Sequence, residues 1–517
     1  MVSKRLRVAA GFILALLLMT SVFAKTKDLQ EITVLAWDRG IIPPAQGNIE
    51  ENWWTQYVND HVAKLGIKVK FIPVPRAQEM QKLPTMLAAG NAPDIIFSYD
   101  KALYNLYLKN GALLDYTDSI NKYGRNLKKY FSKADLALGA SKGRIYSLVY
   151  RSVPVADTTF IRKDWLNKLG LKEPTTPAEF YNVLKAFREK DPGKVGDKLI
   201  PFALPSAPNY PFGLWYAVLM PGFLKQAPSP EKMQEVALPL WPETKNCMRF
   251  MNKLYNEKLL SDQFLLDKDE VLFRQKFVRG EIGAFVHYPH WPYHSAYGNM
   301  YENLNKNIPD AKLVATFPWA TNPKNNLYEI IRCYPFGYMW YSPRNVKHPD
   351  LVVKYLDWMA SAEATNVNWF GLPGIDNKLV DGIPMPIDDV KYKQRVPWIG
   401  SQYNILRNPF VNSPEKYIKR LAMDFAPQYR DQYVQETIAG SKKLKYYQPW
   451  ITEATPLYDK LNGSLMKKWE ELQVKIITAP SNQFDAVFDD AIKQYKEVGG
   501  AEAAQELAQA YKAQYGK

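Results

Sequence analysis

The chain has 517 residues, of which 47% are hydrophobic and 23% charged, and its formal net charge at pH 7 is +15. This hydrophobic content excludes a disordered chain, and the length suffices for two or three domains with well-filled cores. The charge favours anionic partners such as acidic sugar polymers or an anionic membrane surface, although a need for solubility explains it equally well. We expect no nucleic acid partner, because the sequence has no basic run, zinc-ligand spacing or recognition-helix pattern.

The N-terminus is typical of an export signal. Three basic residues precede an apolar run over residues 8–19, and residues 22–24 (VFA) fit the site at which signal peptidase cuts. The apolar run is shorter than a membrane-spanning helix requires, so a membrane anchor is the weaker alternative. We expect residues 1–24 to be a signal peptide and the mature chain, with a net charge of +12 once the three basic residues are removed, to begin at Lys25. Because no cysteine for lipid attachment lies near this junction, we expect a free protein in the periplasm.

Strand and helix signals alternate from residue 31 to residue 98. β-branched or apolar runs at residues 32–36, 67–72 and 94–97 predict three strands, and the helical stretches between them end at glycines. Short strands separated by helices predict a parallel sheet with crossover helices.

Polar and aromatic residues follow the first and the third of these strands. Trp37, Asp38 and Arg39 follow the first strand, and Tyr99 and Asp100 follow the third. Because ligands of such sheets bind at the carboxyl ends of the strands, we predict that these residues bind the ligand.

Helical patterns dominate the middle and the end of the chain. Residues 176–179 (TPAE) form a predicted capping box with proline at the first helical position, and apolar residues follow at the spacing of one buried face. Further helices are expected after Thr455, over residues 483–498 and after Gly500. Internal repeats and low-complexity linkers are absent from the sequence, so we expect lobes joined by several crossings of the chain.

The sequence offers little support for catalysis. Residues 139–143 (GASKG) match a nucleophile elbow, but that motif requires a following helix, whereas residues 144–149 read as a strand; a hairpin turn is favoured. The sequence has no phosphate-binding glycine loop and no paired-histidine zinc helix. A secreted polysaccharide hydrolase or lyase with two dispersed carboxylates would leave no motif and is the alternative function.

Three of the five histidines, His287, His290 and His294, lie within eight residues. Two prolines between them prevent the helix that would bring the imidazoles to one face, so we expect neither a metal nor a cofactor there. The stiff loop from His287 to Tyr293 combines flat rings with polar tips, which suits a sugar. We therefore predict that Trp291 stacks on the ligand.

Aromatic and planar polar side chains are the groups that recognise sugars. Rings cover the C–H faces of a pyranose, while side chains such as Arg, Asp and Asn meet its hydroxyls, and Arg also pairs with a carboxylate. Rings beside polar groups at strand ends or in irregular loops are therefore candidates, although packing explains each one equally well. Beyond those already named, the predicted ligand-binding residues are Tyr150, Arg151, Trp215, Arg332, Tyr334 and Trp398.

The two cysteines, Cys247 and Cys333, match no metal-ligand or redox spacing. They either form one disulfide in the oxidising space outside the cytoplasm or remain two buried thiols. We favour two buried thiols, because a chain of this length does not need a covalent crosslink.

Several segments together resemble family 1 extracellular solute-binding proteins of ABC importers. These segments are residues 83–95 (LPTMLAAGNAPDI), 160–166 (FIRKDWL), 169–171 (LGL), 241–244 (WPET) and 369–374 (WFGLPG). The similarity runs through nearly the whole mature chain. Within the family the chain is similar to the large branch that binds alginate and other complex polysaccharide fragments.

This resemblance implies a two-lobed α/β periplasmic-binding-protein fold with a ligand cleft between the lobes and a helical C-terminal region. We expect one lobe to contain residues 25–157 and 328–390, and the other residues 158–327 and 391–517. The implied protein is a monomer and no enzyme. It captures an oligosaccharide, here expected to be acidic and uronate-containing, by lobe closure and delivers it to an ABC permease.

The resemblance also implies a calcium loop that this chain has altered. Members of that branch carry an acidic, asparagine-rich loop after the helix that ends in Lys-Asp-Pro. Here the loop is residues 191–198 (DPGKVGDK), in which two lysines and a valine replace oxygen ligands. Since calcium takes six or more oxygens, we expect no bound calcium.

Overall fold

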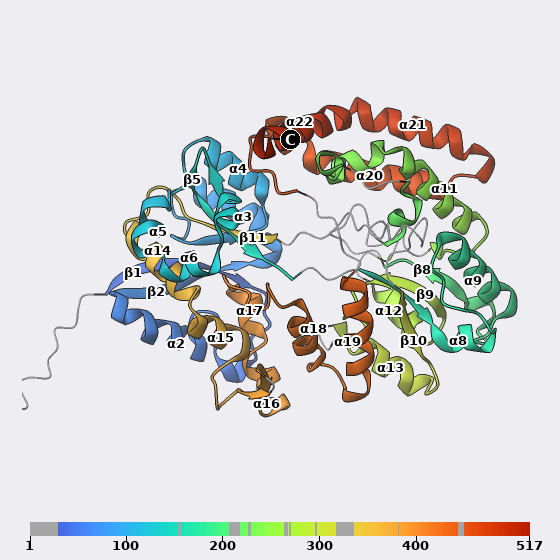
Figure 1. Ribbon diagram of the computed structural model, residues 1–517, viewed down its shortest axis with the longest axis horizontal. Helices are drawn as coiled ribbons and strands as arrows, with labels where there is room; N and C mark the ends of the chain where they lie inside the picture. The colour runs from blue at the N-terminus through green and yellow to red at the C-terminus, as the bar shows by residue number, and fades with distance from the viewer. Residues whose placement is uncertain are drawn as a thin grey trace, which may run out of the picture.

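Two lobes lie side by side in Figure 1, and long helices near the C-terminus run along the top of the second lobe. The two-lobed α/β architecture and the helical C-terminal region predicted from the sequence are confirmed. The predicted signal peptide, Cys333 and three predicted site residues (Trp215, Arg332 and Tyr334) lie outside the described residues. The computed structural model describes residues 29–153, 157–205, 218–225, 229–262, 267, 270–294, 297–316, 336–380, 382–442 and 449–516.

The sheets of the first lobe are formed by β1 (Gln30–Asp38), β2 (Ile67–Pro75), β3 (Ile96–Ser98), β6 (Ser147–Arg151) and β11 (Phe336–Tyr341). β1 and β2 are parallel, as predicted. The segment leading into β3 lies on the other side of β1, because the Leu35 amide donates to the Ile95 carbonyl. β11 lies antiparallel between β3 and β6. The carboxyl ends of β1 and β3 therefore meet at one edge of the lobe.

Helices cover these sheets in the first lobe (Figure 1). Buried residues recur along these helices at helical spacing. This spacing gives the helices an apolar face, which packs on the strands. The helices are α2 (Trp53–Val62), α3 (Glu79–Ala88), α4 (Lys101–Lys109), α5 (Thr117–Tyr123), α6 (Arg125–Tyr130), α7 (Lys133–Ala137), α14 (Pro349–Met359), α15 (Ala362–Phe370), α16 (Asp389–Arg395) and α17 (Trp398–Gln402).

Two small hairpins complete the first lobe. β4 (Ala140–Ser141) and β5 (Arg144–Ile145) are antiparallel, with the turn between them at positive φ. The segment that matched a nucleophile elbow is therefore the hairpin turn that the sequence favoured. β12 (Asn377–Val380) pairs with β13 (Ile383–Pro386) in the second hairpin.

The second lobe contains a four-stranded sheet in the order β10 (Leu313–Thr316), β7 (Thr158–Arg162), β9 (Ile282–His287) and β8 (Ile200–Ala203). β8 and β9 are parallel, and the other neighbours are antiparallel. The helices of this lobe are α8 (Lys163–Lys168), α9 (Pro177–Lys190), α11 (Pro242–Asn256), α12 (Val271–Val278), α13 (Met300–Asn307), α18 (Pro414–Ala422), α19 (Pro427–Ser441), α20 (Pro456–Thr478), α21 (Phe484–Glu497) and α22 (Gly500–Tyr515).

The predicted helix after Thr176 is confirmed as α9. The Thr176 side chain accepts a hydrogen bond from the Glu179 amide at 3.2 Å. The Glu179 carboxylate does not close the capping box on Thr176; it accepts from the Thr175 amide at 2.7 Å. The predicted apolar face is buried, so this helix serves packing.

The buried residues form one main core in the first lobe and two in the second. The first-lobe core takes residues from 32–149 and 338–406 together with Trp450, and the second-lobe cores take residues from 160–314, 418–433 and 451–510. Because residues 392–406 pack in the first-lobe core, we propose that the chain crosses to the second lobe after Leu406, later than the predicted boundary at 390. The predicted boundaries at 157 and 327 adjoin or lie in residues outside the described ranges and stay predictions.

Cys247 is a buried free thiol on α11, and burial raises the pKa of this thiol.

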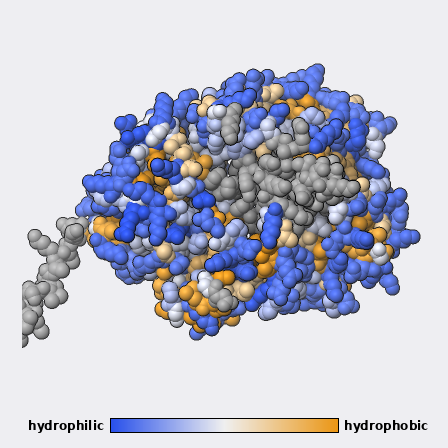
Figure 2. Space-filling model, in the orientation of Figure 1, coloured by the Kyte–Doolittle hydropathy of each residue, from blue (hydrophilic) through white to orange (hydrophobic). Residues whose placement is uncertain are grey.

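Hydrophilic residues dominate the face of the molecule that Figure 2 shows. In the described ranges, none of the helices combines the length and the hydrophobicity that crossing a bilayer requires.

Candidate functional site

A cavity of about 400 Å³ lies on the first lobe at the carboxyl ends of β1 and β3. Its wall combines aromatic rings with guanidinium and amide groups, and no described residue of the wall is a carboxylate. Four residues predicted from the sequence come together here: Trp37, Arg39, Tyr99 and Tyr150. The other residues of the wall are Tyr338, Asn368, Trp369, Val396, Pro397, Gly400, Ser401, Asn404 and Ile405.

Strand pairing brings the aromatic rings of the cavity into contact. The rings of Trp37 and Tyr99 stack with their centroids 5.6 Å apart. Tyr338 on β11 meets both rings edge-on, and Tyr150 on β6 stacks on Tyr338 at 4.7 Å. Trp37 is only 1% exposed, whereas Tyr99 is 54% exposed. Tyr99 is therefore the ring of this stack that a ligand can reach, with Trp37 supporting it from the core.

Two arginines flank the Trp37 ring. The Cζ atom of Arg39 lies 5.1 Å from the ring centroid, and that of Arg76 lies 4.4 Å from it. Arg76 pairs with the buried Glu79 carboxylate at 2.9 Å, while Arg39 has no ion pair among the described residues and donates from Nε to the Ser401 carbonyl at 2.9 Å. Partial burial and the nearby Arg76 charge lower the pKa of Arg39. One end of the cavity therefore carries unneutralised positive charge.

Asn404 combines a left-handed backbone with an unpaired amide. Its φ of +50° lies in the left-handed region, which asparagine adopts more readily than most residues with a side chain and which is common just after the C-cap of a helix such as α17. The side chain is buried, and its Nδ2 atom has no hydrogen-bond partner among the described residues. An unsatisfied buried donor costs free energy, and a bound ligand is one way to satisfy it. Asn404 is therefore a candidate ligand-binding residue.

Asn368 and Trp369 hold the wall from the end of α15. The Oδ1 atom of Asn368 accepts a hydrogen bond from Trp54 Nε1 at 2.7 Å. Trp369 Nε1 donates to the Arg407 carbonyl at 2.9 Å. Because the indole N–H of Trp369 is already bonded, the part of this side chain left for a ligand is its ring face.

Sequence reasoning missed Arg76, Tyr338, Asn368, Trp369 and Asn404. β2 extends to Pro75, beyond the predicted strand end at residue 72, so Arg76 stands at a strand end like Arg39. The strand-end rule would have found Arg76 had the strand been given its full length. No local pattern marks Asn404 as a ligand contact, because a left-handed asparagine after the C-cap of a helix such as α17 is an ordinary helix ending.

A family model for bacterial extracellular solute-binding proteins matches residues 47–366. The chain belongs to this family. Lipoprotein LipO of Bacillus subtilis is 25% identical over 463 residues, which cover 86% of each chain. The polygalacturonan/rhamnogalacturonan-binding protein YtcQ of Bacillus subtilis is 29% identical over 243 residues, 45% of this chain and 44% of that relative. The fructooligosaccharide ABC transporter substrate-binding protein FusA of Streptococcus pneumoniae is 31% identical over 166 residues, 29% of this chain and 27% of that relative.

Solved structures of other proteins share the fold. The alginate-binding protein AlgQ2 without calcium ion is 20% identical, with a TM-score of 0.62 that covers 94% of this chain and 98% of that chain. An extracellular solute-binding protein of Bifidobacterium longum subsp. infantis is 17% identical, with a TM-score of 0.66 and coverage of 94% and 98%. The predicted family and fold class are thus confirmed, and this family consists of binding proteins, not enzymes.

In this solute-binding protein, two predicted acidic residues make local backbone contacts. The Oδ1 atom of Asp38 accepts from the Gly40 amide at 3.0 Å, and that of Asp100 accepts from the Leu103 amide at 2.9 Å. Asp38 thus closes a turn after β1, and Asp100 caps the start of α4. Neither side chain lines the cavity. A contact of either with the ligand stays a prediction.

Arg151 and Trp398 lie next to cavity residues but face other partners. Arg151 pairs with Asp135 at 3.1 Å, so its charge is already neutralised. Trp398 is buried at the start of α17, where its Nε1 atom donates to the Gln394 carbonyl at 3.0 Å. Both contacts hold the first lobe together, and neither side chain is presented to the cavity.

The predicted sugar-binding loop of the second lobe is a core element. Trp291 is 0% exposed, and its ring stacks on His287 with centroids 4.5 Å apart. Phe273, Phe277 and Phe285 surround the same ring at 5.3–5.6 Å. The loop folds back against the end of its own strand β9, which buries the rings that the sequence suggested were presented to a sugar. The structure offers no face of Trp291 to a ligand.

Of the histidines of this loop, His287 is buried and His290 is partly buried. His287 Nδ1 accepts from the Tyr288 amide at 2.8 Å, and its Nε2 lies 3.4 Å from a carboxylate oxygen of Glu270. Burial lowers the pKa of His287, although Glu270 opposes that shift. Burial also lowers the pKa of His290 to about 3. The His290 imidazole is therefore neutral at physiological pH.

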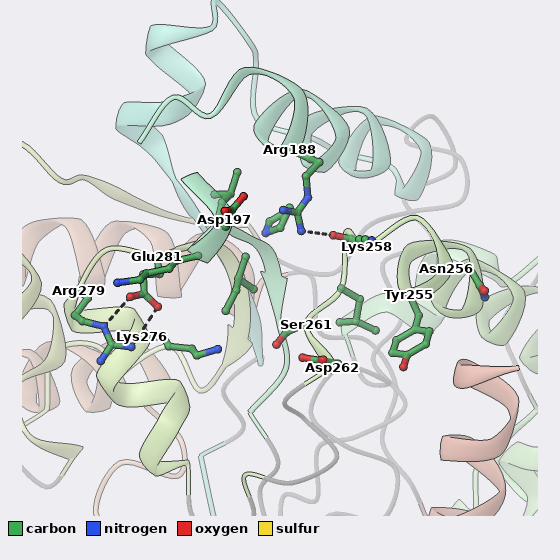
Figure 3. Close-up of a pocket in the computed structure, with 15 residues that line it drawn as sticks. Arg188, Asp197, Tyr255, Asn256, Lys258, Ser261, Asp262, Lys276, Arg279 and Glu281 are labelled. Carbon is green, nitrogen blue, oxygen red and sulfur yellow. Dashed lines mark hydrogen bonds and ion pairs between the residues drawn. The ribbon is translucent and has the colours of Figure 1, made fainter. Parts of the chain in front are cut away.

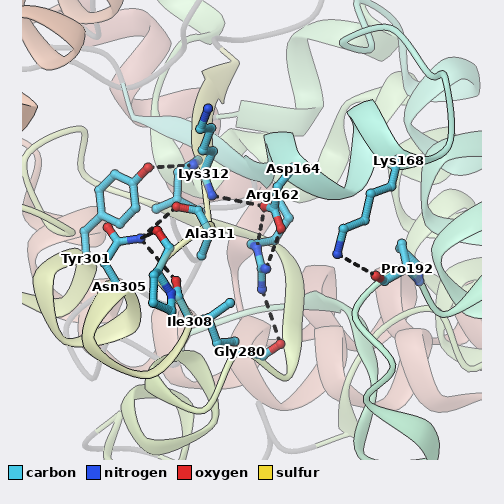
Figure 4. Close-up of polar contacts among 12 residues, drawn as sticks. Arg162, Asp164, Lys168, Pro192, Gly280, Tyr301, Asn305, Ile308, Ala311 and Lys312 are labelled. Carbon is cyan, nitrogen blue, oxygen red and sulfur yellow. Dashed lines mark hydrogen bonds and ion pairs between the residues drawn. The ribbon is translucent and has the colours of Figure 1, made fainter.

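Protein groups close the loop after α9, and Figure 4 shows one of these contacts, between Lys168 and Pro192. The two carboxylate oxygens of Asp191 accept from the Val195 and Gly196 amides, each at 2.8 Å. Lys168 Nζ donates to the Pro192 carbonyl at 3.1 Å. The structure shows no cluster of three or more metal-binding side chains in its described part. The expectation that this loop holds no calcium stays a prediction.

A larger hollow of about 750 Å³ lies on the second lobe, at the amino ends of β8 and β9 (Figure 3). Of its cationic side chains, Arg279 pairs with Glu281 at 2.7 Å and Arg188 donates to the Lys258 carbonyl. These cations stand near the carboxyl ends of helices, where they complement the helix dipoles. Ligands of parallel sheets bind at the other ends of the strands, the carboxyl ends. The first-lobe cavity is therefore the better candidate site.

Proposed function

We propose that this solute-binding protein captures an oligosaccharide in the periplasm and delivers it to the membrane permease of an ABC importer. Two relatives bear names that support a saccharide ligand: YtcQ is named for binding polygalacturonan and rhamnogalacturonan, and FusA for fructooligosaccharide. The observation that carries the proposal is the first-lobe cavity, in which an exposed ring stands beside amide and guanidinium groups.

The chemistry of this cavity suits a sugar ring. Tyr99 and Trp369 offer aromatic surface to the C–H face of a pyranose, and the stack of Trp37 behind Tyr99 keeps that ring in place. Asn404 adds a side-chain amide whose donor has no partner among the described residues. Apolar ring faces combined with a few fixed polar groups are typical of small-molecule sites.

We further infer that the ligand carries uronate carboxylates. The guanidinium of Arg39 meets no carboxylate in the described wall, whereas the neighbouring Arg76 is already paired with Glu79. A ligand carboxylate would neutralise this charge and accept bidentate hydrogen bonds, which are the stronger kind. A wall whose described residues include no acidic side chain favours ligands that accept hydrogen bonds over ligands that must also donate them.

Capture would proceed by closure of the two lobes around the sugar. Contacts that exist only in the closed form let the ligand shift the equilibrium toward that form. The cavity lies beside the crossing after Leu406, since Asn408 Nδ2 donates to the Tyr150 hydroxyl at 3.3 Å. Rotation at this crossing would bring second-lobe groups over the bound sugar. We expect the protein to work as a monomer.

Titration with trigalacturonate and with its reduced, neutral counterpart tests the proposal. The uronate should bind at least tenfold more tightly than the neutral sugar, in low and in high salt, because a buried charge pair is poorly screened. Arg39→Gln should reduce the affinity for the uronate by roughly 10 to 100-fold, the range of charge-assisted hydrogen bonds, and should abolish the preference. Isothermal titration calorimetry gives both numbers.

Arg125→Gln is the matched control, because it removes an exposed arginine of the same lobe outside the cavity. It should leave the preference unchanged. Equal affinity of the wild-type protein for both sugars would contradict the acidic ligand and leave a neutral oligosaccharide. Appearance of shorter or unsaturated products during incubation would favour a hydrolase or lyase instead.

A further inference from the structure

An exposed hydrophobic surface lies on residues 371–395, which form β12, β13 and α16. In this segment the side chains of Leu379 and Val390 are 71% and 68% exposed. Figure 2 shows a group of hydrophobic residues at the lower left of the molecule, where Figure 1 places α16. The large hydrophobic residues that the structure shows as exposed in this segment are Ile375, Leu379, Val380, Ile387 and Val390.

Residues on either side of the 371–395 segment line the first-lobe cavity. Asn368 and Trp369 precede it, Val396 and Pro397 follow it, and all four line the cavity. The chain thus leaves the ligand site, forms the exposed hydrophobic surface and returns to the ligand site. A change in the cavity wall has a short covalent path to this surface.

A polar network fixes the base of the segment to the lobe. The buried Asp376 carboxylate pairs with Arg395 Nε at 2.9 Å and accepts from the Leu372 amide at 2.8 Å. Asn377 Nδ2 donates to the Phe370 carbonyl at 2.9 Å. An isolated two-stranded hairpin is only marginally stable, so these contacts hold β12 and β13 in a defined position.

Tyr392 of α16 joins the cavity wall to the second lobe. Its hydroxyl donates to the Trp369 carbonyl at 3.3 Å and accepts from Arg420 NH2 at 2.7 Å. Arg420 belongs to α18, whose Ile418 and Ala422 pack in a second-lobe core. The 371–395 segment therefore contacts the ligand cavity, the first lobe and a helix of the second lobe. Closure of the lobes must change its position relative to at least one of them.

We propose that the 371–395 segment is the surface by which the loaded protein docks on the periplasmic face of its permease. The proposal rests on the proposed import function, in which a membrane partner must distinguish loaded from empty protein. Gathered, exposed apolar side chains mark interaction sites. Here they are continuous with the ligand cavity and with the junction of the lobes, the two features that such a partner must sense.

The charge of the segment favours a protein partner over a lipid surface. Residues 371–395 contain four acidic and four basic residues, a net charge of zero in a chain of net charge +15. Binding to an anionic membrane relies on an excess of lysine and arginine beside the apolar groups. A neutral apolar surface instead matches an apolar surface on a protein.

The first test replaces the apolar tip with Leu379→Asn and Val380→Asn together. In the host cell the double variant should import labelled trigalacturonate at least tenfold more slowly, while its affinity for this sugar in solution changes less than twofold. Val271→Asn with Leu272→Asn is the matched control, because it changes an adjacent, exposed valine and leucine on α12. The control should import at the wild-type rate. Normal import by the Leu379 and Val380 variant, or loss of its affinity in solution, would overturn the proposal.

A second test does not depend on the identity of the sugar. Leu379 is replaced with the photoreactive p-benzoylphenylalanine, and intact cells are irradiated. A crosslink to an integral membrane subunit of an ABC permease is expected. A crosslink to a second copy of this chain or to lipid, or no crosslink at all, would overturn the docking surface. Failure of the wild-type protein to bind trigalacturonate would contradict the proposed ligand, while the crosslink still decides the docking surface.

Discussion

The residues at the first-lobe cavity and those of the loop from His287 to Tyr293 are similar in composition. Their surroundings, however, are opposite. Both mix aromatic rings with polar side chains just after a strand. In the cavity the strand ends leave Tyr99 exposed above a buried Trp37, whereas the loop folds back on β9 and buries Trp291 completely. The comparison teaches that composition at a strand end indicates which groups are available, while the direction in which the chain leaves the strand decides whether a ligand can reach them.

The largest effect is expected for Trp291→Ala. Removing a fully buried indole leaves a void among Phe273, Phe277 and Phe285, which should lower the free energy of unfolding by about 3–5 kcal/mol. Sugar affinity measured well below the melting temperature should hardly change. Urea denaturation and calorimetric titration measure the two quantities. A loss of affinity without a loss of stability would return this ring to the ligand site.

Tyr99→Ala should do the reverse of Trp291→Ala: it should weaken ligand binding and leave the stability nearly unchanged. Affinity for the oligosaccharide should fall by about 1.5–3 kcal/mol, the scale for contact area of a large side chain. The free energy of unfolding should change by less than about 1 kcal/mol because the ring is more than half exposed. Tyr99→Phe keeps the ring and serves as the control. Unchanged affinity of the alanine variant would remove the stacking role from Tyr99.

A somewhat smaller effect is expected for the way in which the free energy of unfolding depends on pH, through a carboxylate of the second lobe. Burial between α19 and β10 raises the pKa of Glu436 to about 7 from its ordinary value of 4.5. The folded state therefore holds a proton between pH 4.5 and 7 that the unfolded state releases, so the free energy of unfolding falls as pH rises through this window. Glu436→Gln should abolish this part of the pH dependence and raise stability at pH 8 by about 2 kcal/mol.

Thermal melts of wild type and Glu436→Gln between pH 4.5 and 8 measure that effect. Glu415→Gln, which alters an exposed carboxylate on α18, is the control and should retain the slope. A wild-type stability that is flat across this range would show that Glu436 is ionised without cost in the folded state.

The smallest effect is expected from removal of divalent ions. Asp191 already accepts two backbone hydrogen bonds, and Lys168 lies against the same loop. Incubation with a calcium chelator should leave the melting temperature within about 1 °C, because we expect no ion to contribute to the folded state. A clear drop that added calcium reverses would reveal a retained site.

Local rules predicted the elements whose signals are local. The parallel pairing of β1 and β2, the start of α9 at Thr176 and the hairpin at residues 139–145 followed from β-branched runs, a capping residue and the lack of a following helix. The family followed from motifs spread along the chain. Position at a strand end was enough to bring Trp37, Arg39 and Tyr99 into the candidate site.

Tertiary structure decided which of these side chains a ligand can reach. Asn368, Trp369 and Asn404 join Trp37 only because α15 and the chain after α17 pack beside the end of β1, more than 300 residues away in sequence. That packing buries Asn404, and Arg151 pairs with Asp135 and is not presented to the cavity. Sequence patterns record the chemistry of a side chain, but burial and pairing depend on contacts between distant segments that no local pattern contains.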